Sequence, residues 1–248
     1  MDILLAVQDT INRYDLIKKG NTILVACSGG ADSTALLYIL REIKDTLGIS
    51  DIQVAHLDHR IRKDSHKDAD FVKNICDNIS VSCTIYSVDV PGFAKKNSLS
   101  LEDAARRIRY EFLEKKRKEL HLDLIATGHT LNDQIETLFL RIDRGTGLKG
   151  LSLIPPKRAK IIRPLIRTYR NEILQFLNSR SIPYRTDKSN LDLSIKRNLV
   201  RHKLISHLLD ILPDFGEKLI RLRDTLEADE KVIESIIDKI WDEVIETE

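Results

Sequence analysis

The sequence predicts an α/β protein in which a parallel β-sheet carries helices on both faces and a helical tail follows at the C-terminal end. The main observation is that short apolar runs alternate with longer amphipathic segments, which is typical of repeated strand and helix units. The strand candidates are almost continuously apolar, as strands buried between two helical layers are. A chain of 248 residues with 42% hydrophobic residues is long enough to bury such a core.

The elements follow one another in a regular order. The first strand is expected at residues 22–27, and apolar residues recur at helical spacing over residues 34–47. Three further strand and helix pairs are expected, with Ser100 as the N-cap of the second of these helices. The strands are expected at residues 52–57, 82–88 and 122–127, and the helices at residues 67–79, 100–120 and 131–144.

Glycines and prolines mark residues 145–156 as a loop, after which the pattern changes. Residues 161–165 are expected to return to the sheet, and residues 169–179 and 193–212 to be helical. Apolar residues at three-to-four spacing between Leu219 and Val244 predict one amphipathic helix or a helical pair. This predicts a main domain at residues 1–213 and an acidic helical tail at residues 214–248. The apolar stripe needs a covering surface within the chain or in another subunit, which leaves a homodimer open.

Cysteine usage and the N-terminal sequence predict the compartment. The three cysteines form no CxxC pair, as expected where thiols stay reduced, and this excludes a disulfide scaffold and a zinc ribbon. The first residues lack a basic segment and a long apolar segment, and nowhere do 18 apolar residues run together. We therefore expect a soluble cytoplasmic protein with no membrane partner.

Charge is distributed unevenly although the formal net charge is only +2. Residues 157–203 contain 13 Lys or Arg against three acids, a net charge of +10, whereas residues 216–248 have a net charge of −6. A basic stretch of this kind is the footprint expected for a polyphosphate partner. A solvated, salt-bridged surface explains the charge of this stretch equally well.

A glycine-rich loop lies between the first predicted strand and its helix. It reads Ser28, Gly29, Gly30, Ala31, Asp32 and Ser33. The glycines let the backbone approach an anion, and the helix N-terminus adds partial positive charge. The serine hydroxyls would donate to phosphate oxygens, and a carboxylate beside phosphate makes sense if it holds Mg²⁺. We therefore predict a phosphate-binding loop with Asp32 as the magnesium ligand.

Other interpretations of this glycine-rich stretch fit its residues less well. A structural glycine turn with an Asp or Ser helix cap is the alternative, but the strand, loop and helix context favours phosphate binding. The loop differs from GxxxxGK[ST], has no lysine for a γ-phosphate, and differs from GxGxxG, so a dinucleotide fold has little support.

The pattern SGGxDS resembles the signature loop of the N-type ATP pyrophosphatases, the PP-loop superfamily. That resemblance implies a Rossmann-like, adenine nucleotide alpha hydrolase-like fold that uses ATP and Mg²⁺. It also implies cleavage of ATP between the α and β phosphates and adenylation of a substrate. The superfamily includes synthetases of several kinds, so the loop alone does not choose the substrate.

Further segments resemble the tRNA(Ile)-lysidine synthetase family, in its order, over roughly residues 20–205. The matching segments are residues 56–62, 100–110, 128–137, 144–151, 163–165, 187–190 and 197–201. The resemblance implies that ATP adenylates the C2 oxygen of the first anticodon cytidine of AUA-reading tRNA(Ile), which has a CAU anticodon. Free L-lysine would then displace AMP to give lysidine.

The resemblance also implies roles for individual residues. Residues 1–213 would be an ATP-dependent activation domain with a tRNA-facing basic segment at residues 157–203. Catalytic roles fall to Arg109, Asp133 and Glu136, ATP contacts to residues 28–33 and His129, and tRNA contacts to Arg163, Arg197 and Arg201.

Two of these groups have ordinary structural explanations as well. Glu102, Arg106 and Arg109 fall at i, i+4 and i+7, which also fits an exposed ion-pair face on a helix. Asp133 and Glu136 share one helical face near the same sheet edge as the loop, where they would hold Mg²⁺, hold a substrate ammonium or act as a base. They also fit an acidic first turn that the helix dipole favours.

Some positions support no firm assignment. His56, Asp58 and His59 could be metal ligands, but no fourth ligand is evident. Thr130 and Asn132 stand where the resembling family usually has its second His and first Asp, so roles that depend on those two positions are in doubt.

Two rival functions remain. A PP-loop tRNA thiolase would need a cysteine pair or cluster for sulfur delivery or an iron–sulfur centre, and the three cysteines offer no such spacing. A non-catalytic nucleotide- or RNA-binding module would not need the acidic and basic residues named above.

Overall fold

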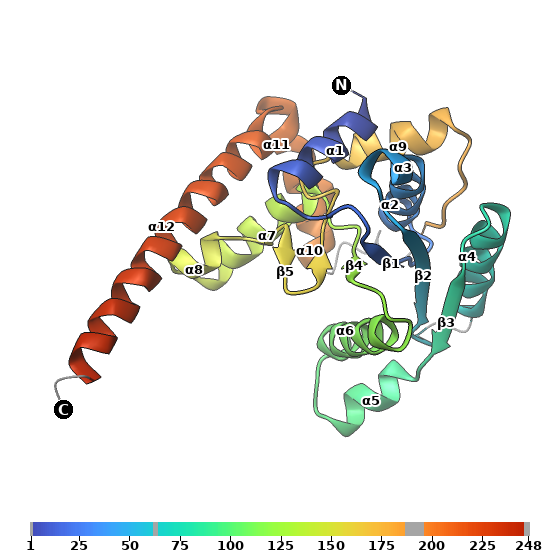
Figure 1. Cartoon of the computed structure of the whole chain (residues 1–248), viewed down its shortest axis with the longest axis horizontal. Helices are drawn as coiled ribbons and strands as arrows, with labels where there is room; N and C mark the ends of the chain where they lie inside the picture. Colours follow the sequence, from blue (N-terminus) through green and yellow to red (C-terminus); the bar gives the residue numbers. More distant parts are fainter. Residues whose placement is uncertain (1, 62–63, 187–195, 246–248) are drawn as a thin grey trace. The chain divides into compact units, whose positions relative to one another are not determined.

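The computed structural model describes residues 2–61, 64–186 and 196–245 of the chain (Figure 1). These residues form two compact units. Unit 1 comprises Met1–Thr130 and Pro156–Lys188, and unit 2 comprises Leu131–Pro155 and Ser189–Glu248. Each unit therefore combines segments that are distant in the sequence. The boundary expected near Pro213 is a different division and stays a prediction.

Unit 1 contains a six-stranded sheet in the order β3-β2-β1-β4-β6-β5, and all neighbouring pairs except β5 with β6 are parallel. The strands are β1 (Thr22–Ala26), β2 (Asp51–Asp58), β3 (Cys83–Ser87), β4 (Leu124–Ala126), β5 (Lys157–Arg158) and β6 (Ile161–Ile162). This confirms the predicted mostly parallel α/β fold and the return of the chain to the sheet after residue 160.

The central strand β1 is the point where the strand order reverses. Its Ile23 lies opposite Ile52 of β2 on one side and opposite Leu124 of β4 on the other. In open parallel sheets, ligands bind at the carboxyl ends of the strands at such a reversal. The segments that follow β1 and β4 are therefore in the expected position for a ligand site.

Helices cover both faces of the sheet in unit 1. Ile23 and Val25 point into a core that includes residues of four helices, whereas Leu24 between them packs with Phe112 and Leu113 on the opposite face. The first face carries α1 (Ile3–Arg13), α2 (Ala31–Glu42), α4 (His66–Asn78) and α9 (Arg170–Ser179), and the second carries α6 (Leu101–Glu119), against which α5 (Val90–Lys96) packs.

Most predicted elements of unit 1 are present, with a few differences. Helices α1 and α5 and strand β5 were not expected from the sequence. Helix α2 begins at Ala31, three residues before the expected start, because Gly30 is extended and its carbonyl accepts the first helical bond from Thr34 N–H at 3.0 Å. A short helix, α3 (Lys44–Leu47), follows α2. Ser100 is the N-cap of α6, as predicted, and its Oγ accepts from Asp103 N–H at 3.0 Å.

Unit 2 is helical. Its elements are α7 (Leu131–Arg144), α8 (Leu148–Leu151), α10 (Lys196–Leu199), the π-helical segment η2 (Val200–Leu204), α11 (Ile205–Ile211) and α12 (Phe215–Ile245). The tail is thus one helix rather than a pair, and Phe215 at its start stacks on Phe139 of α7 with ring centroids 6.4 Å apart. The helix expected at residues 193–212 is confirmed from Lys196 onward, whereas its first residues and the matching segment 187–190 lie outside the described residues.

Among the side chains of helix α12 that the structure describes, the buried ones lie in the first turns. Leu219 and Ile220 are buried, while Ile236, Ile237 and Trp241 are exposed further along. These exposed apolar side chains would suit an interface with a second copy of the chain, and the homodimer stays a prediction. Within the parts of the chain that the structure describes, none of the helices combines the length and apolarity needed to cross a membrane.

Candidate functional site

The glycine-rich loop between β1 and α2 has a backbone that only glycine suits. Gly29 has φ +84°, and a Cβ atom there would lie 3.2 Å from side-chain atoms of both Phe71 and Val72. The carbonyl of Gly29 accepts a hydrogen bond from Arg185 N–H at 2.8 Å, and Arg185 Nε donates to Asp68 Oδ1 at 2.9 Å. Residues of α4 and of the segment after α9 therefore fix the position of the loop.

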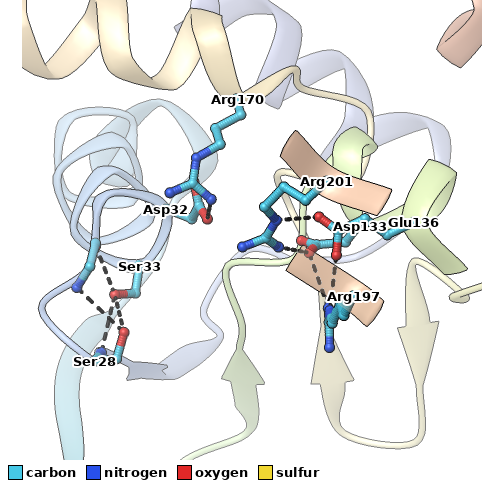
Figure 2. Close-up of polar contacts among 9 residues, drawn as sticks. Ser28, Asp32, Ser33, Asp133, Glu136, Arg170, Arg197 and Arg201 are labelled. Atoms are coloured by element: carbon cyan, nitrogen blue, oxygen red, sulfur yellow. Dashed lines mark hydrogen bonds and ion pairs between the residues drawn. The ribbon is translucent and has the colours of Figure 1, made fainter. Parts of the chain in front are cut away.

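The two serines of the loop form one hydrogen-bonded group (Figure 2). Ser33 Oγ lies 3.1 Å from Ser28 Oγ, accepts from Ser28 N–H at 3.1 Å and lies 3.1 Å from Gly30 O. Gly30 N–H points at Ser28 Oγ at 3.4 Å, and no side chain caps the first turn of α2. Hydroxyl groups, loop N–H groups and the helix N-terminus are thus gathered at one point, which is the donor set that phosphate requires.

Asp32 lies in the first turn of α2 and is paired with an arginine that the sequence analysis did not connect to the loop (Figure 2). Arg170 Nη1, at the start of α9, donates to Asp32 Oδ2 at 3.1 Å, and both side chains are partly exposed. The pairing shows that a cation is accommodated at this carboxylate.

Gly128 brings the end of β4 against the start of α2. A Cβ atom at Gly128 would lie 3.1 Å from the backbone C and O of Asp32 and from the backbone N of Ser33. His129 follows, with its Nδ1 3.0 Å from Thr127 Oγ1. The structure therefore places the predicted ATP-binding residue His129 next to a glycine that touches the phosphate loop.

A group of polar residues lies at the carboxyl end of β2. His56 is buried and its Nδ1 donates to Cys27 O at 2.9 Å, and burial lowers its pKa below the ordinary value. Burial, followed by the positive charge of Arg109, lowers the pKa of His59 to about 4, so Arg109 lies close to this imidazole. Among the described residues, no three or more His, Cys, Asp or Glu side chains are grouped to hold a metal ion.

In unit 2, the two carboxylates of α7 that the sequence singled out lie together with two arginines (Figure 2). Glu136 has no exposed surface, and Asp133 is 7% exposed. Arg197 Nε donates to Glu136 Oε2 at 2.9 Å and Arg197 Nη2 to Asp133 Oδ1 at 3.4 Å. Arg201 Nη2 donates to Asp133 Oδ1 at 3.2 Å, and Arg201 Nε also pairs with Glu136. We call these four residues the carboxylate cluster.

In the carboxylate cluster, the two carboxylates stabilise the charged form of Arg197. Burial lowers the pKa of Arg197, but the charge and hydrogen bond of Glu136 and the charge of Asp133 outweigh it, so the pKa lies above its ordinary value. The neighbouring Gln134 is also buried and exchanges hydrogen bonds with the backbone of Ile154, at 2.7 and 2.9 Å. Gln134 thus fixes the end of the loop after α8.

The three arginines expected to contact tRNA lie among other side chains of the protein. Arg197 and Arg201 belong to the carboxylate cluster, so they contact acidic side chains of their own unit. Arg163 is only 3% exposed; burial lowers its pKa, and the neighbouring Tyr110 hydroxyl opposes this. The buried guanidinium of Arg163 offers little surface to an RNA phosphate in this structure, and tRNA contact by the three arginines stays a prediction.

The loop and the two carboxylates were predicted from the sequence, but the pairing of arginines with these carboxylates and with Asp32 was not. Arg170 lies 138 positions from Asp32, and Arg197 lies 61 positions from Glu136. The only signal for Arg170 was its membership of the basic stretch at residues 157–203. Nothing in the sequence around Arg185 or Gly128 indicates that these residues contact the loop.

Comparison with known proteins identifies the fold and the family. The family described as PP-loop domain matches residues 4–208. A Thermosipho africanus protein named tRNA(Ile)-lysidine synthase is 42% identical over 211 residues, which are 85% of this chain and 49% of that protein. A Clostridioides difficile protein of the same name is 38% identical over 231 residues, which are 92% of this chain and 50% of that protein.

A similar solved structure has the same fold. The U34-tRNA thiolase NcsA from Methanococcus maripaludis superposes with a TM-score of 0.75 at 20% sequence identity, covering 91% of this chain and 78% of that chain. The present chain spans about half the length of the curated relatives named above. Its phosphate loop, its parallel sheet and the extent of the family match together show that the chain belongs to the PP-loop domain family.

Proposed function

We propose that the chain catalyses ATP-dependent attachment of lysine to the first anticodon cytidine of an AUA-reading tRNA(Ile) with a CAU anticodon. The observation that carries the proposal is the identity of 38 to 42% with proteins named tRNA(Ile)-lysidine synthase, over most of this chain. The cysteines give the thiolase alternative no comparable support, since the sequence has only three and no CxxC pair. An enzyme that uses tRNA, ATP and free lysine would work in the cytoplasm.

The residues of the phosphate loop fit ATP with Mg²⁺. Gly29 leaves no room for a side chain and Gly128 approaches the first turn of α2, so the loop presents N–H groups that larger residues would obstruct. Ser28 and Ser33 supply hydroxyl donors, and Asp32 supplies the carboxylate oxygen that Mg²⁺ prefers. Mg²⁺, when bound, would neutralise charge on the phosphates. Arg109 and His129 would contact the nucleotide or the activated cytidine.

The reaction has two steps in this proposal. The C2 oxygen of the cytidine attacks the α-phosphorus of ATP, and the bond to pyrophosphate breaks. The ε-amine of lysine then attacks C2, and AMP leaves with the oxygen. The lysine ammonium must lose a proton before it attacks, because a protonated amine has no free electron pair.

The carboxylate cluster supports a lysine-binding role. Asp133 and Glu136 already accept hydrogen bonds from two guanidinium groups, so their surroundings favour cations. A carboxylate has about four lone-pair sites, which lets an ammonium share oxygens with arginine. The cluster would hold the lysine, and one of its carboxylates would accept the proton. The tRNA backbone would contact other residues of the basic stretch at residues 157–203.

Mass spectrometry of the modified nucleoside tests the proposal directly. The protein would be incubated with a tRNA(Ile) transcript bearing a CAU anticodon, ATP, Mg²⁺ and isotope-labelled lysine, and the transcript would then be digested. We expect the label in the first anticodon nucleoside, and no label with a transcript in which uridine replaces that cytidine. An unlabelled anticodon in all samples, together with a sulfur-containing nucleoside when a sulfur donor is added, would favour the thiolase instead.

A further inference from the structure

The phosphate loop lacks a cation of its own. Residues 28–33 contain no lysine or arginine, whereas P-loop proteins of the GxxxxGK[ST] type carry a lysine that reaches the β- and γ-phosphates. A pyrophosphate group brings several negative charges to the site, and Asp32 adds another. Positive charge must therefore come from residues that the fold brings to the loop.

Arg170 brings its guanidinium to a side chain of the loop. Arg185 also contacts the loop, but through its backbone N–H, and its guanidinium pairs with Asp68 of α4. The guanidinium of Arg170 contacts Asp32 at 3.1 Å (Figure 2), and its side chain is 33% exposed, so part of it is open to solvent. A guanidinium has five N–H donors in a planar fork, and this geometry matches both carboxylate and phosphate oxygens. One side chain of this kind therefore suits either anion.

The backbone of Arg170 is fixed while its side chain is long enough to swing. It is the first residue of α9, where Tyr169 N–H donates to Glu172 Oε2 at 2.7 Å and closes the first turn. Ile173 and Leu177 bury α9 in the core beside α2. A change of partner at Arg170 therefore requires side-chain rotation alone.

A purely structural role explains the ion pair poorly. Ion pairs between partly exposed side chains contribute little to the stability of a fold. Arg167, three residues earlier, makes an ion pair of that kind with Asp9 of α1, which is not a residue of the loop. Arg170 differs because its partner is the one acidic residue of the phosphate loop.

We propose that Arg170 is the cation of the phosphate site, pairing with Asp32 while the site is empty and moving to the oxygens of the leaving pyrophosphate when ATP and Mg²⁺ bind. The inference rests on the proposed use of ATP. In this exchange, Asp32 would be released to hold Mg²⁺, and the guanidinium of Arg170 would bind pyrophosphate oxygens that water otherwise solvates. Arg170 therefore competes with the metal ion before the nucleotide binds and assists the pyrophosphate afterwards.

Two binding measurements without tRNA or lysine test the exchange. Binding of Mn²⁺ to the nucleotide-free protein would be followed by electron paramagnetic resonance, and binding of magnesium pyrophosphate by calorimetry. In Arg170→Gln we expect Mn²⁺ affinity to rise about two- to fivefold, because its competitor is gone. We expect pyrophosphate affinity to fall about 10- to 100-fold, because a charge-assisted contact is lost.

Controls separate this result from damage to the fold. Arg167→Gln removes the same charge from the same segment and should change neither affinity. Arg170→Lys should recover part of the pyrophosphate affinity, because it keeps the charge but not the fork. Asp32→Asn should abolish the binding of Mn²⁺ to this site. Circular dichroism of each variant would confirm that the helices are intact.

The outcomes distinguish the inference from the proposed function. A fall of both affinities in Arg170→Gln, or no change in either, would overturn the role of Arg170. Failure of the unaltered protein to bind pyrophosphate would overturn the use of ATP as well. Normal pyrophosphate binding without lysine incorporation would contradict the proposed function and leave the role of Arg170 standing.

Discussion

At the scale of single residues, the clearest feature is the balance of charge in the carboxylate cluster. Two carboxylates and two guanidiniums lie within hydrogen-bonding distance, and Glu136 has no contact with solvent. Buried charges of this kind are retained only where they are paired. Asp133 keeps a small exposed surface, so it is the carboxylate through which a ligand would enter the cluster.

Asp133→Asn should separate activation of tRNA from lysine attachment. The amide keeps the size of the side chain but loses the negative charge that holds and deprotonates an ammonium, so lysine incorporation should fall about 100-fold or more. Exchange of labelled pyrophosphate into ATP in the presence of tRNA should persist. Asp143→Asn is the matched control, since Asp143 lies on the same helix in an exposed pair with Lys196. Unchanged lysine incorporation in Asp133→Asn would refute a role for this residue.

His59 should give the protein a defined sensitivity to acid. Its pKa in the folded chain is about 4, through burial and then through Arg109, whereas an unfolded histidine titrates near 6.5. Between these values the unfolded chain binds a proton that the folded chain does not, so the free energy of unfolding decreases as the pH falls. His59→Gln should weaken this dependence in urea titrations at about pH 7 and about pH 5. His207→Gln, at an exposed histidine of α11, should keep the original dependence.

At the scale of elements, the proposed phosphate site is built at the junctions between strands and helices. The sequence predicted strands and helices well, because periodicity is a local property of residues such as Ile23 to Val25 and their neighbours. The loop was predictable because all of its donors lie within six consecutive residues. The start of α2 was placed too late, since the sequence does not reveal that Gly30 is an extended N-cap.

Gly128→Ala should damage the junction between β4 and α2. The new Cβ would lie 3.1 Å from the backbone of Asp32 and Ser33, and a backbone in the first turn of a helix yields less readily than a side chain. We expect roughly tenfold weaker pyrophosphate binding and a loss of about 1 to 3 kcal/mol in the free energy of unfolding. Gly147→Ala is the control, because nothing lies within 4 Å of its Cβ position. Equal effects of both substitutions would contradict the close approach.

At the scale of the whole molecule, the chain builds two units from interleaved segments. The core of unit 1 includes Leu165, Ile173 and Phe176. These residues come after Leu131–Pro155, the first segment of unit 2. The partners Arg170, Arg197 and Arg201 also come from later segments than the residues they contact. A single sequence cannot pair such distant residues, since the contacts depend on the assembled fold. This is why the loop and carboxylates were predicted and their arginine partners were not.

Glu136→Gln should affect one unit and spare the other. Removing a buried charge leaves two guanidiniums against one carboxylate, which typically costs about 3 to 5 kcal/mol. All four members of the cluster belong to unit 2. Hydrogen exchange measured by mass spectrometry should therefore speed up in peptides of α7, α10, α11 and α12 and stay unchanged in β1, β2 and α4. A uniform increase across both units would show that they unfold together.

The short strand β5 bears on how the protein behaves at high concentration. Exposed edges of β-sheets invite pairing with the sheets of other molecules, and charged residues on short strands prevent it. Strand β5 forms one edge of the sheet of unit 1, is two residues long and consists of Lys157 and Arg158, both exposed. The first two residues of the basic stretch therefore protect the native sheet against edge-to-edge aggregation, a role that needs no RNA partner.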